Sequence, residues 1–182
     1  MSQREDQAST EEFVLPENLL PLGSVLGPGV TPMDVCMVLA KIFQVQYTEV
    51  ALLRLEQGFL RFLFPEHLRT TGAIPLSSKA VAAHTALAKK PEIFNNFAKV
   101  KHASIFETIR SDAPEQEPAP PSPIQKLMSV PILDHDRSVI GVIQISRKGN
   151  DARSATDFSR EDLHDLELAA SVLASSPALH AE

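Results

Sequence analysis

Residues 128–174 limit the possible folds more than any other part of this sequence. They begin with two apolar runs rich in β-branched residues, at 128–133 and 139–145. The polar residues between the runs have the length of a hairpin connection, so the runs are expected to pair as antiparallel strands. The second run carries apolar side chains on both faces, which is typical of a central strand covered on both sides. Gly141 lies within it, where a missing side chain permits a bend or the close approach of another element or a ligand.

A helix is predicted over residues 159–174. Ser159 is a natural N-cap residue, and Asp162 stands at the third helical position, as in a capping box. Phe158 and Leu163 occupy the hydrophobic-staple positions on either side of the cap. Apolar residues then recur at helical spacing until Pro177 ends the pattern. One face of this helix is apolar and small, which permits close packing on a sheet or on a second subunit.

The upstream sequence predicts a further helix and a second hairpin. Thr31 is a capping residue, Pro32 follows at the first helical position, and Asp34 completes a capping-box-like pair. Beyond about residue 46, two apolar runs at 49–55 and 59–64 flank a short turn. Short strands are expected near residues 74 and 93. These elements predict an α+β fold with a central, mainly antiparallel β-sheet flanked by helices.

Several motifs resemble the GAF domain family. The fragments SVPI, VIGVIQIS and DFSREDL are similar to the family's C-terminal half, in which a strand centred on Ile-Gly-Val precedes Phe-(Ser/Thr)-x-x-(Asp/Glu) at the start of the last helix. Residues 74–76, the helix expected at 77–90 and the strand at 91–96 are similar to its middle section. The resemblance covers roughly residues 31–175 and implies a GAF/PAS-like fold, which by itself does not determine a ligand or an output.

The predicted organisation is a single domain at residues 31–176. Residues 1–30 are expected to be an acidic, partly disordered leader whose apolar residues could pack on a partner, and residues 177–182 a tail. Residues 111–123 contain five prolines and three acidic residues, which indicates an extended loop. In the resembled family this neighbourhood covers the ligand pocket, and the alternative is a tolerated surface insertion.

Charge and hydropathy narrow the range of partners. Seventeen basic and twenty-three acidic residues give a net charge of −6, with no basic stripe interleaved with aromatic residues, so nucleic acid is not an expected partner. No run approaches the roughly 20 apolar residues of a membrane span, and the polar start lacks the pattern of a signal peptide. We therefore expect a cytoplasmic protein without a membrane partner.

The sequence predicts no enzymatic activity. Cys36 is the single cysteine, which is interpreted as a small buried hydrophobic residue. The free methionine sulfoxide reductases, one enzymatic branch of the resembled family, rely on several cysteines. No nucleophile elbow, glycine-rich phosphate loop or zinc-protease motif is present in the sequence.

Candidate ligand-binding residues follow from predicted position. His84 is expected on the apolar face of the middle helix, and His102 lies at helical spacing from Phe106. The proposed pocket adds Phe94 and Asn96. In some GAF domains a histidine ligates haem or contacts a tetrapyrrole, but a lone histidine on an apolar face is more often an ordinary hydrogen-bonded residue.

No cofactor can be named from these residues. The Asn-Lys, Phe, Asp-Glu signature of cyclic-nucleotide-binding GAF domains has no match in order after Asn95. Lys99 and Lys101 could hold a phosphate, although solvated lysines on an exposed face are the simpler interpretation. His135 lies between two aspartates in the expected hairpin turn, where turn chemistry rather than a metal site is expected.

The functional hypothesis is a sensory, regulatory domain. It would bind an unidentified small molecule between the sheet and the middle helices, and signal through its terminal helices to a separate protein, as a homodimer. The alternative is a ligandless dimerisation and protein-docking module of the same fold. A third possibility, a cofactor-dependent enzyme, would carry a coloured or bound group.

Overall fold

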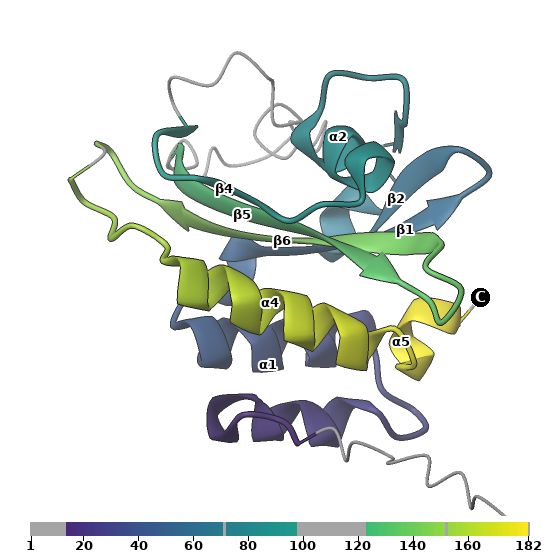
Figure 1. The fold of residues 1–182 in the computed structure, drawn as a ribbon. Coiled ribbons are helices and arrows are strands. Elements are labelled where there is room, and N and C mark those ends of the chain that lie inside the picture. Colours follow the sequence, from purple (N-terminus) through teal and green to yellow (C-terminus); the bar gives the residue numbers. More distant parts are fainter. Residues whose placement is uncertain (1–13, 71, 98–122, 152, 182) are drawn as a thin grey trace, which may run out of the picture.

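The computed structural model describes residues 14–70, 72–97, 123–151 and 153–181. Within these ranges, six strands form one sheet in the order β3-β2-β1-β6-β5-β4, and every neighbouring pair is antiparallel (Figure 1). The strands are β1 (Val50–Glu56), β2 (Phe59–Phe64), β3 (Ala73–Pro75), β4 (Glu92–Phe94), β5 (Ile124–Leu133) and β6 (Val139–Lys148). The predicted α+β fold with a mainly antiparallel central sheet is therefore confirmed.

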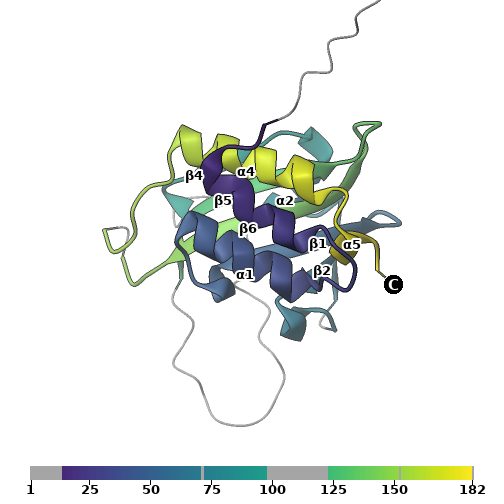
Figure 2. The same cartoon turned by 90° about the horizontal axis from the view of Figure 1, so that it is seen from below.

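Helices cover both faces of the sheet. α1 (Pro32–Phe43) and α4 (Arg160–Leu173) lie on one face, and α2 (Val81–Ala88) lies on the other (Figure 1). The 3₁₀ helix η1 (Glu17–Val25) contacts both α1 and α4, and runs between them when the molecule is seen from below (Figure 2). The short helices are η2 (Tyr47–Glu49), η3 (Glu66–Leu68) and α5 (Pro177–His180). None of the described helices is both long and apolar enough to span a bilayer.

The hairpin predicted at residues 128–145 is present and central. β5 pairs with β6, and β6 also pairs with β1, so that Ile143 and Ile145 are fully buried. The space left by Gly141 is occupied by backbone, because a Cβ atom there would lie 2.3 Å from the carbonyl oxygen of Leu53. The close approach expected at this glycine therefore comes from the neighbouring strand β1.

Both predicted helix starts carry capping boxes. The Thr31 hydroxyl accepts a hydrogen bond from the Asp34 N–H at 3.2 Å, and the Asp34 carboxylate accepts one from the Thr31 N–H at 2.8 Å. The Thr31 N–H and the Thr31 hydroxyl both donate to the Asp34 carboxylate, which holds the pKa of Asp34 below its ordinary value. The same reciprocal pair links Ser159 and Asp162, at 3.0 and 2.7 Å. Both signals are therefore confirmed at the level of individual bonds.

The described part of the expected leader contains η1, which packs on the chain's own helices. Leu19, Leu22 and Val25 are buried against the chain's own α1 and α4. Their spacing of three matches the 3₁₀ repeat, which places all three on one face of η1. The Ser176 hydroxyl donates to the Val25 carbonyl at 2.8 Å, which ties η1 to the start of α5.

The expected tail is also part of the packed core within its described residues. Ala178 and Leu179 of α5 are buried in the same apolar cluster as α1 and α4. Residues 1–13 of the leader and all of the proline-rich loop except Pro123 lie outside the described residues.

Candidate functional site

α2 lies close to the sheet because its inward residues are small. Ala82, Ala83 and Ala86 are buried against an apolar area of β1, β2 and β6 that includes Leu53 and Val142. Small side chains permit a close approach between a helix and a sheet, but they provide little specific contact. The specific contacts under α2 come instead from polar groups.

A row of polar side chains crosses the sheet beneath α2. The strand register aligns Glu92 of β4 with Ser129 of β5, and Ser129 with Gln144 of β6. Residues paired across neighbouring strands point to the same face of a sheet. Thr85 reaches this row from α2, with its hydroxyl oxygen 2.7 Å from that of Ser129.

The protons of this cluster can be assigned by counting donors. The Thr85 hydroxyl donates to the Val81 carbonyl at 3.0 Å, so its single proton is used there. Ser129 must therefore donate to Thr85, while the Gln144 amide donates to Ser129 at 3.3 Å. Thr85 and Ser129 are fully buried and Gln144 nearly so. The result is a directed chain of hydrogen bonds from the sheet into α2.

Glu92 ends this polar row with one unsatisfied oxygen. Its Oε1 lies 2.7 Å from Nδ1 of His84, whereas its Oε2 is buried and has no hydrogen-bond partner in the described part of the structure. A buried acceptor without a donor is unfavourable, because the water that would solvate it has been removed. Oε2 of Glu92 is therefore a hydrogen-bond acceptor that no described residue uses.

The predicted placement of His84 on the apolar face of the helix is wrong. The His84 side chain is 66% exposed, and the neighbouring apolar residue Leu87 is 61% exposed. α2 is apolar on nearly every side, so its spacing pattern does not mark the face that packs on the sheet. Thr85 faces the sheet in place of His84, and His84 contacts the polar row through Glu92.

Of the other predicted site residues, Phe94 and Asn96 lie within the described part of the chain. Phe94 is half buried and packs near Val81 of α2, with its ring centroid 6.3 Å from that of Phe97. Asn96 is exposed, whereas its neighbour Asn95 is hydrogen-bonded to the backbone of Phe158. His102 and Phe106 lie outside the described residues. Sequence reasoning missed Thr85, Glu92, Ser129 and Gln144, because only the strand register brings them together.

Few side chains in the described part of the chain could support metal binding or thiol chemistry. Among the described residues, no group of three or more His, Cys, Asp or Glu side chains could hold a metal ion. His135 is exposed in the β5–β6 turn, where Asp134 Oδ1 accepts from the N–H groups of Asp136 and Ser138 at 2.9 Å each. That is the Asx-type turn the sequence predicts. Cys36 is fully buried on α1, and burial raises the pKa of its thiol.

Solved structures with the same fold are GAF domains and related enzymes. The GAF domain of an Acinetobacter phosphoenolpyruvate-protein phosphotransferase has 14% identity and a TM-score of 0.62, with 92% of this chain and 95% of that chain covered. The A. aeolicus nlh2 GAF domain in an inactive state has 14% identity and a TM-score of 0.57, with 86% and 93% covered. The type II free methionine-R-sulfoxide reductase of Thermoplasma acidophilum has 19% identity and a TM-score of 0.54, with 81% and 89% covered.

The sequence itself identifies the family. No curated protein resembles the sequence closely enough to count as a match. The family model of the GAF domain, in contrast, matches residues 30–176, which is close to the predicted domain at 31–176 and spans most of the 182-residue chain. The chain therefore belongs to the GAF domain family.

Proposed function

We propose that this GAF domain is a regulatory module that binds a small molecule at the α2 face of its sheet. The observation that carries the proposal is the polar row under α2, which ends at the unpartnered Oε2 of Glu92. An interface made only of apolar residues would hold α2 on the sheet without the cost of desolvating Thr85, Ser129 and Gln144. A ligand-recognition role gives a reason for that cost.

The chemistry of the row indicates what kind of ligand group it would accept. Oε2 of Glu92 is a hydrogen-bond acceptor, so its complement is an N–H or O–H donor on the ligand. The apolar cluster of Val81, Leu127 and Phe97, with Phe94 packed on it, lies beside the row and would suit an apolar part of the same molecule.

A binding role rather than catalysis is proposed. The Thermoplasma acidophilum neighbour is an enzyme, a type II free methionine-R-sulfoxide reductase. In this chain the single cysteine is Cys36, which is buried on α1 on the opposite face of the sheet from α2. Because burial raises the pKa of this thiol, the reactive thiolate is disfavoured.

The experiment for this proposal is a thermal-shift screen with matched variants. The panel contains cyclic nucleotides, other nucleotides, amino acids, oxo-acids, haem and bilins. A ligand at about 100 times its dissociation constant adds about 2.7 kcal/mol, which is several degrees for a chain of this size. A saturable rise is expected in the wild-type chain and in Glu66→Gln, a control glutamate that is exposed on η3. The rise should be reduced or lost in Glu92→Gln.

Two results would count against this proposal. An equal rise in Glu92→Gln and in the wild-type chain would remove Glu92 from the site. If no compound in the panel raises the melting temperature, the ligand-binding role loses its support and the docking role described next becomes the better hypothesis.

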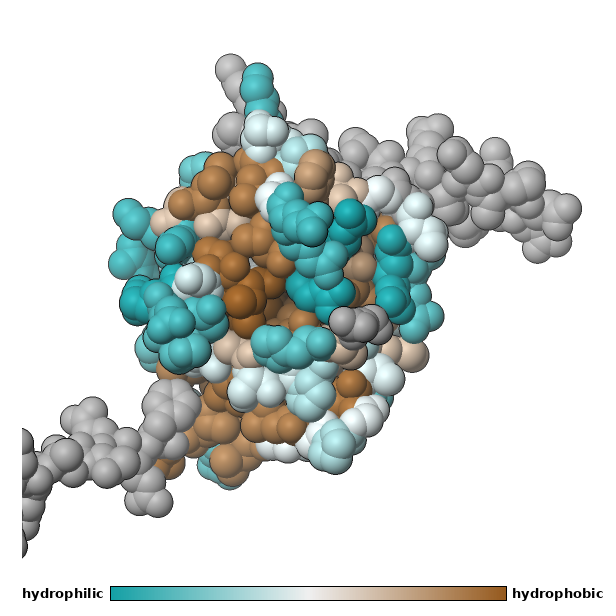
Figure 3. Space-filling model, turned by 90° about the vertical axis from the view of Figure 1, so that its right-hand side faces the viewer, coloured by the Kyte–Doolittle hydropathy of each residue, from teal (hydrophilic) through white to brown (hydrophobic). Residues whose placement is uncertain are grey.

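A second candidate function is a ligandless dimerisation and protein-docking module. Apolar side chains are exposed on the outer side of the helical layer, with Leu20 58%, Met33 45% and Met37 37% exposed. Figure 3 also shows an apolar area framed by hydrophilic side chains, at the end of the molecule where the C-terminus lies. Leu55, Val139 and Ile140 are partly buried residues of the strands that reach this end.

The two candidate functions differ in oligomeric state and in ligand response. Light scattering of the purified chain, with and without each panel compound, separates them. A dimer that no compound changes favours the docking module. A Leu20→Ser, Met33→Ser double variant should then be monomeric, whereas an unchanged dimer would place the interface elsewhere.

A further inference from the structure

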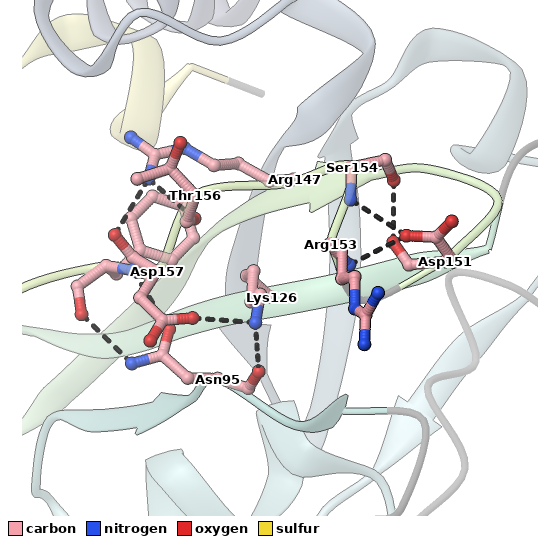
Figure 4. A network of polar contacts seen from close by, with 9 residues as sticks. Asn95, Lys126, Arg147, Asp151, Arg153, Ser154, Thr156 and Asp157 are labelled. Atoms are coloured by element: carbon pink, nitrogen blue, oxygen red, sulfur yellow. Dashed lines mark hydrogen bonds and ion pairs between the residues drawn. The ribbon is translucent and has the colours of Figure 1, made fainter.

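A second polar network lies at the β4 edge of the sheet (Figure 4). Lys126 of β5 is about 5% exposed, so its ammonium group depends on protein partners. It donates to the backbone carbonyl of Asn95 at 2.6 Å, and it pairs with the carboxylate of Asp157 at 2.6 Å. The network thus joins the residue that follows β4 to the chain that leads into α4.

The Asn95 side chain makes a two-point connection to the same place. Its Oδ1 accepts from the Phe158 N–H at 2.9 Å, and its Nδ2 donates to the Phe158 carbonyl at 3.0 Å. Two bonds to one residue fix both position and orientation, as a pair of strand hydrogen bonds does. Phe158 directly precedes Ser159, the N-cap of α4.

Phe158 is itself held on its other side. It is 3% exposed, and the Arg147 guanidinium lies 4.1 Å from the centre of its ring. Arg147 also donates to the carbonyls of Thr156 and Asp157, at 2.9 and 3.1 Å. The start of α4 is therefore anchored to two strands, and a displacement of Asn95 would act on a closely restrained residue.

Two aromatic residues close to Asn95 in the sequence belong to the other face of the sheet. Phe94 and Phe97 pack in the apolar cluster that includes Val81, the first residue of α2. Within four residues the chain therefore contacts α2 on one face and the start of α4 on the other. β4 is an edge strand, so this connection runs around the edge of the sheet and not through its close-packed centre.

We infer that Asn95 is a positioning residue that couples the α2 face of the sheet to the start of α4. The inference rests on the proposed function, since it supplies the route from a ligand at α2 to the helical layer on the opposite face. A change in the packing of Val81, Phe94 or Phe97 would shift Asn95, and its two bonds would transfer that shift to Phe158 and to the first turn of α4.

The test is a double-mutant cycle read by hydrogen exchange, and it needs no ligand. Val81→Ala perturbs the α2 side. Exchange is followed at the amides of Asp162 and Leu163, which donate to the hydroxyl and the carbonyl of Ser159, relative to amides of β6 that report global unfolding. In the wild-type background, Val81→Ala should raise the exchange rate at the start of α4 by about 2- to 30-fold. The coupling energies found for such networks correspond to rate changes of this size. In the Asn95→Ala background, the same substitution should leave exchange there nearly unchanged.

Matched variants keep the result interpretable. Leu60→Ala, a truncation in the other apolar cluster on the α2 face, should raise exchange at the start of α4 only as much as it raises exchange in β6. Asn95→Asp keeps the acceptor for the Phe158 N–H and loses the donor, so it should retain part of the coupling. Should Asn95→Ala fold poorly, Lys126→Met tests the network from its other side, because it removes the ammonium and keeps most of the side-chain volume.

Two outcomes would overturn the inference. One is an equal effect of Val81→Ala with and without Asn95. The other is no local effect of Val81→Ala at the start of α4 in the wild-type background. Both are independent of the thermal-shift screen, which tests the proposed ligand site separately.

Discussion

The Cys36 thiol lies in the apolar core between the sheet and the helical layer. Burial both hides its sulfur atom and raises its pKa, so the thiolate that attacks disulfide reagents is scarce in the folded chain. We expect an aromatic disulfide reagent to leave the native protein unmodified for hours and to react with one thiol after denaturation. Rapid reaction of the native protein would contradict the buried position.

At two places in this chain, adjacent residues have different roles. Asn95 holds Phe158 through two hydrogen bonds, whereas Asn96 is exposed. Thr85 faces the sheet, whereas His84 faces solvent. Which of two adjacent residues faces the sheet depends on side-chain direction, which a pattern of apolar residues does not specify.

At the scale of single elements, β6 depends on close backbone contact at Gly141. A Cβ atom there would lie 2.3 Å from the backbone carbonyl oxygen of Leu53, which cannot move without displacing β1. Gly141→Ala should therefore lower the free energy of unfolding by about 1–3 kcal/mol, as for other overpacked sites. Urea denaturation measures the change.

Gly23→Ala is the matched control for this substitution. A Cβ atom at Gly23 would have no heavy atom within 4 Å, so the change should stay within about 0.5 kcal/mol. Similar losses in the two variants would mean that the approach of β1 to Gly141 is not what requires glycine.

The elements differ in how well sequence patterns describe them. α1 and α4 begin at the predicted caps, because a capping box involves residues three apart in the chain and needs no tertiary context. α2 is shorter than the expected helix and lacks a side-chain cap, and its alanine-rich sequence has no distinct polar face. The sequence of α2 therefore does not determine which face of the helix packs on the sheet.

At the scale of the whole molecule, η1 adds an outer layer to the domain. Leu19 and Leu22 are fully buried against α1 and α4, whereas Leu20 is 58% exposed. Leu22→Ala should lower the free energy of unfolding by about 2–5 kcal/mol, the usual range for a buried leucine. Leu20→Ala, the matched control, should change it by less than about 0.5 kcal/mol.

Equal and small effects of both leucine substitutions would mean that η1 is only loosely attached. A large effect of Leu22→Ala alone would make η1 part of the folded unit.

The fold class, both hairpins, the two capped helices and the family were predictable from the sequence, because each rests on residues close together in the chain. The strand pair β5–β6, for example, is defined by two apolar runs and the Asx turn at Asp134. The polar row was not predictable in the same way. Glu92, Ser129 and Gln144 come from three strands, and only the register of the sheet aligns them under Thr85. Local patterns specify elements, whereas a site made from several elements exists only after those elements have packed.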